Sequence, residues 1–505
     1  MATLEPESSP ADGPRLPSLS LALIPVATLI GLLGLSYLLF GDTAAGGPNQ
    51  IALMACALVA YWVGRRLGHP AESLRQAVSE SVNTGLSAIF ILLAVGSLIG
   101  TWAMSGTLMA MVYWGLQLLS PNYFYLTTAG ICAIVALCIG SSWTVAGTIG
   151  IGLMGVAEQM GLDPAITAGA VISGSYFGDK SSPLSDATNL AAAAAGANLY
   201  DHIKETLWTS VPTLAIALVI FWALGQPGDF DASEITAGIA ASFDVSFVPF
   251  LPLILVLALA FLRWPPFITI FLGALAGGVL AAAIVPERVV AFADAGAMPD
   301  ALALLKGVWT AMATGYESDF GHAAVDQLLS RGGMASMLGT IWLILAALAF
   351  GGVIEKSGVL DRIISPVIRA AKSTGALIAS LVAACLGTNV LASDQYIAIV
   401  LPGRMFQKVF RSRGLAPVVL SRAVGDSATV TSPLIPWNSC GAYMAATLGV
   451  ATISYLPFAF FNLLNPLITI LFASLGLRML KLEVPGPAAT ASQPPAAQQH
   501  PSDKI

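Results

Sequence analysis

Apolar runs close to the length of a membrane crossing recur along almost the whole chain, separated by short polar segments. A helix needs about 20 consecutive apolar residues to cross the hydrocarbon core of a bilayer. Only 10% of the 505 residues are charged and 56% are hydrophobic, whereas soluble domains carry about 25% charged residues. A water-soluble fold of this composition would expose larger apolar patches than monomers tolerate. The sequence therefore predicts an all-α polytopic membrane protein.

Charge and metal-binding residue types exclude several other classes. A net charge of −6 with scattered Lys and Arg argues against nucleic-acid binding. The five cysteines lie in apolar runs without CxxC spacing, and the four histidines are far apart in sequence. We therefore expect neither a disulfide framework nor a zinc site, and no cofactor.

Composition divides the chain into five segments. We expect spans at 86–103 and 375–402, among others, and a break inside the uncharged, glycine-rich stretch 124–157, which is too long for one straight span. The expected segments are a disordered N-terminal tail (1–18), a first transmembrane repeat (19–226), an acidic connector (227–246), a second transmembrane repeat (247–482) and a disordered C-terminal tail (483–505).

Short motifs recur in the two halves. Gly140-Ser141-Ser142 is matched by Gly387-Thr388-Asn389, and Gly178-Asp179 is matched by Gly425-Asp426, each followed by Ser-Pro-Leu. In both halves 38 residues separate the two motifs. Ser105-Gly106 and Ser357-Gly358 form a third pair, offset by 252 rather than 247 residues. We interpret the three pairs as an internal repeat, as in many transporters.

The charges of corresponding loops predict how the two halves are oriented. Arg65 and Arg66 follow the second apolar run, whereas the stretch 316–319 in the second half is acidic. Conversely, the stretch 404–413 is strongly basic and its counterpart 156–163 is acidic. Because short cytoplasmic loops are enriched in Lys and Arg, opposite signs indicate inverted-topology repeats. The same rule places both termini in the cytoplasm, and we expect the chain in the inner membrane of a prokaryotic cell.

The few ionisable residues inside apolar segments are the candidate functional residues, because each costs about 2.5–3.5 kcal/mol to insert at mid-membrane. Asp179, Asp186, Asp394 and Asp426 lie in segments interrupted by Gly or Pro, where helices are expected to break or re-enter. A buried carboxylate could hold either H⁺ or Na⁺, so we expect Na⁺ at these four, with Asp394 as the central group. The hydroxyl and amide oxygens expected beside them belong to Thr388, Asn389, Ser393, Ser182, Asn189, Thr429, Ser432 and Asn438.

Structural explanations compete with this one. Asp179 could pair with the adjacent Lys180, and Asp426 with Arg422 one turn back, as neutral braces. The hydroxyls of Ser182 and Ser432 could serve only local hydrogen bonds at helix ends.

Two enzyme-like patterns are incomplete. The run from Gly174 to Ser181 lacks one spacer residue of a phosphate-binding loop. Asp201 and Asp426 lack the full GxGD sequence of intramembrane aspartyl proteases. We therefore do not expect an enzyme.

Longer motifs carry a family resemblance. Residues 176–180, 182–186, 393–396 and 431–438, together with Gly100-Thr101-Trp102 and the run 347–352, resemble NhaC-type Na⁺/H⁺ antiporters over about 90% of the chain. The resemblance implies Na⁺/H⁺ exchange across a lipid bilayer. The family also contains exchangers of small organic acids such as malate and lactate, which stay open as the alternative. A homodimer is left open as well.

Overall fold

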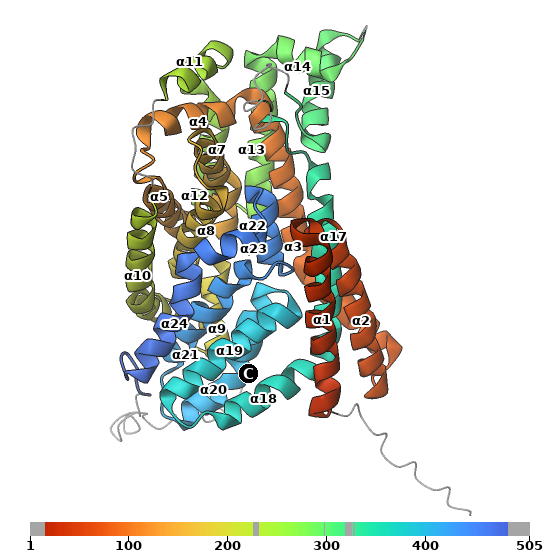
Figure 1. Cartoon of the computed structure of the whole chain (residues 1–505), viewed down its shortest axis with the longest axis vertical. Coiled ribbons are helices and arrows are strands. Elements are labelled where there is room, and N and C mark those ends of the chain that lie inside the picture. The colour runs from red at the N-terminus through yellow and green to blue at the C-terminus, as the bar shows by residue number, and fades with distance from the viewer. Residues whose placement is uncertain (1–15, 226–231, 297, 319–325, 327–328, 483–505) are drawn as a thin grey trace, which may run out of the picture.

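The computed structural model describes residues 16–225, 232–296, 298–318, 326 and 329–482. The predicted tails lie almost entirely outside the described residues, as do residues 227–231 of the acidic connector. Apart from two isolated bridges, regular structure in the described part of the chain is helical (Figure 1). The predicted all-α class is therefore confirmed.

The two halves of the chain contain similar series of helices (Figure 1). The first half contains α1 (Leu19–Phe40), α2 (Pro48–Arg66), α3 (Ala71–Ser105), α4 (Thr107–Leu118), α5 (Phe124–Ile139), α6 (Ser142–Val145), the π-segment η2 (Ala146–Gly150), α7 (Ile151–Gln159), α8 (Pro164–Ser181), α9 (Asp186–Ala195) and α10 (Leu199–Ala223). Next come α11 (Ser233–Ser242), α12 (Leu251–Phe261), α13 (Pro266–Ile284), α14 (Pro286–Ala293), α15 (Asp300–Thr314), α17 (Leu338–Lys356) and α18 (Val359–Ala370). The chain ends with α19 (Thr374–Ala392), α20 (Gln395–Ser412), α21 (Pro417–Val424), the π-segment η5 (Gly425–Thr429), α22 (Ser439–Leu448), α23 (Thr452–Tyr455) and α24 (Phe460–Ser474).

Six helices in the described residues are long and apolar enough to cross a membrane, and α23 with α24 forms a seventh candidate bent by 55°. Several others, including α4 and α5, are apolar but only 10–17 residues long. Broken and short helices of this kind are tolerated at membrane depth only where protein surrounds them. Most residues of α8 and α22 are buried among other helices, which provides such surroundings.

One expected span is broken. The apolar run 375–402 forms two helices, because α19 ends at Ala392 and α20 begins at Gln395. Ser393 has a left-handed backbone (φ 59°) and Asp394 caps α20. The break predicted inside 124–157 is present, at Gly140 and Ser141 between α5 and α6.

The helices favour another register for the predicted repeat. Gly140 and Ser393 are both left-handed residues directly after equivalent helices, and their positions differ by 253. Gly387 lies inside α19, so pairing it with Gly140 is wrong, and so is the pairing of Gly178 with Gly425 at that same 247-residue offset. The 253-residue offset also relates Gly161 to Gly414, Pro164 to Pro417, Ser185 to Asn438 and Gly196 to Gly449.

Two glycines allow α8 to approach α5 closely. A Cβ atom on Gly174 would lie 2.1 Å from the Ala129 carbonyl oxygen, and one on Gly178 would lie 2.3 Å from the Leu137 amide nitrogen. Small residues four apart let two membrane helices meet backbone to backbone. This contact fixes the C-terminal end of α8, where Asp179 and Lys180 lie.

We predict that Gly178→Val destabilises the protein by at least about 1–3 kcal/mol, the usual cost of overpacking, because a backbone atom cannot move aside as a side chain can. Gly130→Val on α5 is the matched control, since a Cβ at Gly130 meets nothing within 4 Å. Thermal unfolding in detergent measures both. Equal melting temperatures for the two variants would contradict the close approach.

Candidate functional site

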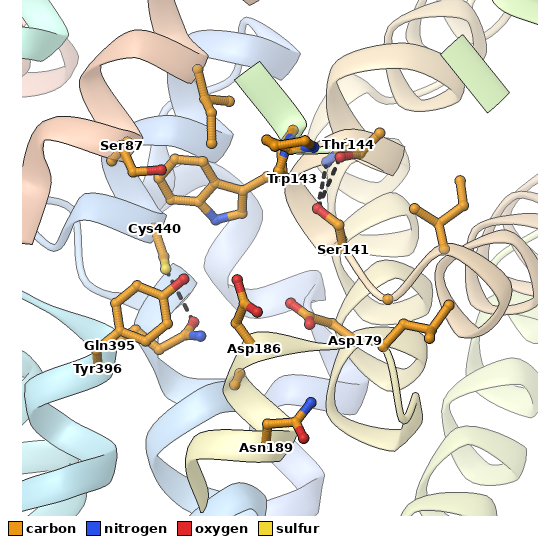
Figure 2. A pocket seen from close by; sticks show the side chains of 18 of the residues that line it. Ser87, Ser141, Trp143, Thr144, Asp179, Asp186, Asn189, Gln395, Tyr396 and Cys440 are labelled. Carbon is orange, nitrogen blue, oxygen red and sulfur yellow. Dashed lines mark hydrogen bonds between the residues drawn. The ribbon is translucent and has the colours of Figure 1, made fainter. Parts of the chain in front are cut away.

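A cavity of about 630 Å³ lies where four helical runs begin. Its lining includes the first residues of α6, α9, α20 and α22, and Figure 2 shows their side chains surrounding one space. Trp143 stacks on Tyr443 with ring centroids 4.0 Å apart, which joins the start of α6 to α22. Residues from both halves of the chain therefore build one site.

Each of these four starts is capped by a polar side chain. The N–H groups of a first helical turn lack intrahelical partners, and a cap supplies an acceptor. The four caps, each with the amide nitrogen from which it accepts, are Ser141 with Thr144 (3.2 Å), Ser185 with Thr188 (3.3 Å), Asp394 with Ile397 (2.9 Å) and Asn438 with Cys440 (3.0 Å).

Two predicted carboxylates lie side by side in the cavity (Figure 2). Asp179 is buried and accepts hydrogen bonds from the hydroxyls of Ser142 (2.6 Å) and Ser185 (2.5 Å). Asp186, in the first turn of α9, is exposed to the cavity, and no hydrogen bond or ion pair within the described residues reaches its carboxylate. Asn189, one turn further on, also lines the cavity. One carboxylate is thus held in place and the other is free to bind.

Asp394 lines the same cavity from the second half of the chain. Asp394 is 3% exposed, and its Oδ1 caps α20 by accepting the Ile397 amide. The left-handed backbone of Ser393 turns the chain so that Asp394 lies at the cavity wall. The Ser393 carbonyl accepts the Ser439 amide at 3.0 Å, which holds the break against the start of α22.

The charges lining the cavity favour a cation. The lining holds three carboxylates, those of Asp179, Asp186 and Asp394, and one basic residue, Arg263. Arg263 is exposed, lies in the link between α12 and α13 and has a left-handed backbone (φ 62°). Carboxylate and hydroxyl oxygens are the ligands that hard cations prefer.

Asp426 does not line this cavity. Its carboxylate forms a buried ion pair with Lys180, and it also accepts the hydroxyls of Thr209 (2.8 Å) and Thr469. The competing explanation by local pairs, Asp179 with Lys180 and Asp426 with Arg422, is therefore not what the described residues form. Arg422 pairs instead with Glu205 on α10, at 2.6 Å.

Most of the other predicted oxygens hold the protein together around the cavity. The Asn389 amide donates to the Ala428 carbonyl (2.8 Å), and the Asn438 amide donates to Asn389 Oδ1 (3.1 Å). The Thr388 hydroxyl donates to the Ala384 carbonyl (2.8 Å) inside α19. The two asparagine side chains attach α19 to η5 and to the N-terminal cap of α22.

The serine and threonine positions differ in their contacts. Ser182 accepts the Leu184 amide at 3.2 Å, so its hydroxyl serves a local hydrogen bond. Ser432 has a wider role, because it donates to Gln395 Oε1 (2.7 Å) as well as to the Thr429 carbonyl (2.8 Å). Ser393 Oγ is buried without a partner in the described residues, and Thr429 is buried in η5.

The sequence interpretation missed several groups that hold or line the site. Ser142 and Ser185 donate to Asp179, and Gln395 and Tyr396 form the opposite wall with Cys440 (Figure 2). Ser142 lies inside the recurring motif at 140–142 and Ser185 lies three residues before Thr188, so helix-capping patterns point to both. No local signal points to Arg263, because its link is brought to the cavity by folding alone.

A helical membrane protein whose broken helices meet at a carboxylate-lined cavity has the architecture of a secondary transporter. The sequence model of the "Na+/H+ antiporter family" matches residues 18–221 and 174–477. The chain is 38% identical to the Na⁺/H⁺ antiporter NhaC of Alkalihalophilus pseudofirmus, over 85% of this chain and 90% of that one.

Two further relatives carry other names. The arginine/ornithine antiporter ArcD of Halobacterium salinarum is 34% identical, with 95% of this chain and 96% of that one covered. The malate-2H⁺/Na⁺-lactate antiporter of Bacillus subtilis is 32% identical, with 88% and 92% covered.

The chain belongs to the Na⁺/H⁺ antiporter family. It is accordingly an integral membrane protein of a prokaryotic membrane, and its relatives are transporters rather than enzymes.

We predict that the cavity admits water-soluble reagents while the segment η5 does not. In a variant with its five cysteines replaced, Asn189→Cys should react with a small charged thiol reagent at least tenfold faster than Thr429→Cys. Asn189 is exposed in the cavity, whereas Thr429 is 1% exposed. Mass spectrometry of the labelled protein measures both rates. Similar rates would contradict the cavity as described.

Proposed function

We propose that the chain exchanges cytoplasmic Na⁺ for external H⁺ by alternating access, with both ions competing for the carboxylates of Asp179, Asp186 and Asp394. The observation that carries the proposal is the convergence of these three acids, from both halves of the chain, on one cavity. Membership of the Na⁺/H⁺ antiporter family and the name of the NhaC relative support Na⁺ and H⁺ as the transported ions.

Competition follows from the chemistry of the three acids. A carboxylate that holds H⁺ offers no charge to Na⁺, and one that coordinates Na⁺ repels a proton. The Ser142 and Ser185 hydroxyls fix Asp179 from one side, which leaves Asp186 and Asp394 to close around a cation.

The same proposal includes inverted repeats with both termini in the cytoplasm. The basic end of α20, with Arg411 and Arg413, and the basic residues Arg478 and Lys481 after α24 support that orientation. The corresponding end of α7 carries Glu158. Opposite orientations of the two halves would let one cavity open to either side in turn.

A second candidate function is the exchange of small organic acids coupled to Na⁺ and H⁺. A cavity of about 630 Å³ is much larger than a dehydrated Na⁺ requires, and Arg263 in its lining could pair with a carboxylate of the substrate. The names of the ArcD and malate/lactate relatives show that organic substrates occur among similar proteins.

The decisive experiment uses purified protein in liposomes with an imposed pH gradient. We expect Na⁺ alone to move protons in the direction opposite to its own, detected with a pH-sensitive dye. No response to Na⁺, with a response once malate or lactate is added, would replace Na⁺/H⁺ exchange by the second candidate. No response in either case would overturn both.

Among single substitutions, Asp394→Asn and Asp186→Asn should each lower Na⁺-driven proton flux at least tenfold, because each removes one titratable ligand from the cavity. Asp201→Asn is the matched control, since Asp201 is exposed in the first turn of α10 and does not line the cavity. Monodisperse elution of each variant in detergent shows that it has folded. Wild-type flux in Asp394→Asn would remove that residue from the mechanism.

A further inference from the structure

The link between α12 and α13 brings a strained arginine to the cavity. α12 ends at Phe261 and α13 begins at Pro266, and both Arg263 and Trp264 of the link line the cavity. Arg263 has a left-handed backbone (φ 62°), a conformation that is unfavourable for a residue with a Cβ atom. Strain of this kind persists only where the surrounding structure enforces it, and it clusters at functional sites.

The hydrogen bonds at the end of α12 form a Schellman motif, a helix ending that usually has glycine at the position of Arg263. The Arg263 amide donates to the Ala260 carbonyl (3.0 Å), and the Trp264 amide donates to the Leu259 carbonyl (3.1 Å). Glycine would adopt the left-handed backbone here without strain. The backbone therefore favours glycine at this position, and what an arginine adds is its side chain.

That side chain supplies the positive charge of the cavity. The carboxylates of Asp179, Asp186 and Asp394 line the same space, and Arg263 is the one basic residue among the described residues of the lining. Arg263 is exposed, and no ion pair in the described part of the chain joins it to any of the three acids. A guanidinium keeps its proton in proteins. Its charge therefore acts at every pH on each cation that enters the cavity.

Without this charge, the cavity would suit a divalent cation. Ca²⁺ takes about six to eight oxygen ligands, which carboxylates and water can supply in a flexible arrangement. The cavity offers three carboxylates and also the hydroxyls of Ser87 and Ser141 (Figure 2). The repulsion between a guanidinium and a cation is proportional to the charge of that cation. Arg263 therefore opposes the entry of Ca²⁺ twice as strongly as the entry of Na⁺.

We propose that Arg263 is a tethered counter-cation that selects Na⁺ over divalent cations in the cavity. Its guanidinium offsets one of the three carboxylate charges, so the remaining charge attracts a monovalent cation but holds a divalent cation weakly. Arg263 neither transfers a proton nor binds the transported ion, and it acts only through its charge. This inference rests on the proposed Na⁺/H⁺ exchange and names the residue that keeps competing cations out of the same cavity.

Arg263→Gly is the sharpest test, because glycine suits the left-handed backbone and the variant should melt no lower than the wild type in detergent. We expect it to bind radioactive Ca²⁺ at least tenfold more tightly than the wild type. Na⁺-driven proton flux in liposomes should be half inhibited at a Ca²⁺ concentration at least tenfold lower. Arg263→Lys is the matched control, since it keeps the charge and should keep the Ca²⁺ affinity of the wild type. Equal Ca²⁺ affinity of Arg263→Gly and the wild type overturns the inference.

A double variant shows where Ca²⁺ binds. Adding Asp186→Asn to Arg263→Gly removes a cavity carboxylate and should abolish the gain in Ca²⁺ affinity, whereas a gain that persists would place Ca²⁺ elsewhere and contradict the inference. The absence of Na⁺-driven flux in the wild type would overturn the proposed exchange, but the binding assay needs no transport and still decides whether Arg263 excludes Ca²⁺. If Arg263 instead anchors an organic acid, Arg263→Gly loses a response to malate or lactate and gains no Ca²⁺ affinity, which also overturns the inference.

Discussion

Backbone groups at a break in a membrane helix must find partners inside the protein, because the hydrocarbon region supplies no water. The site depends on this constraint. The runs that begin with α6, α9, α20 and α22 each start beside the cavity, and each first turn is capped by Ser141, Ser185, Asp394 or Asn438. The caps satisfy the free amides, and they also bring polar oxygen atoms to one place. The structural requirement for capping and the chemical requirement for ion ligands are thus met by the same residues.

At the 253-residue offset, charge is distributed unevenly between the two halves of the chain. With this offset, Asp179 corresponds to Ser432, Asp186 to Ser439, Asp394 to Ser141 and Asp426 to Ser173. Each of these four aspartates therefore corresponds to a serine, not to a second acid, in the other half of the chain. Two carboxylates at equivalent places around one cavity would add like charges at close range, which disfavours ionisation of both. A hydroxyl keeps an oxygen ligand at the position without adding charge.

Local patterns predicted much of this architecture, and contacts distant in sequence account for what they missed. The break at Gly140 is visible because glycine permits the left-handed backbone there, whereas the break at Ser393 lies in an apolar run without Gly or Pro at that point. The motif pairing placed Gly387 opposite Gly140, yet backbone conformation makes Ser393 the counterpart. Four carboxylates were identified from their cost in a membrane. Asp426 lies apart from the other three only in the folded chain, where it pairs with Lys180, 246 residues away in sequence.

The end of α8 lies between the cavity and the buried ion pair of Lys180 with Asp426. Successive residues of a helix point about 100° apart, so Asp179 and Lys180 face different surroundings although they are adjacent in sequence. Asp179 lies in the cavity wall and Lys180 lies against Asp426. Gly178 holds this turn against the backbone of α5. One tightly packed turn of α8 therefore contributes one residue to the cavity wall and the next to the buried ion pair.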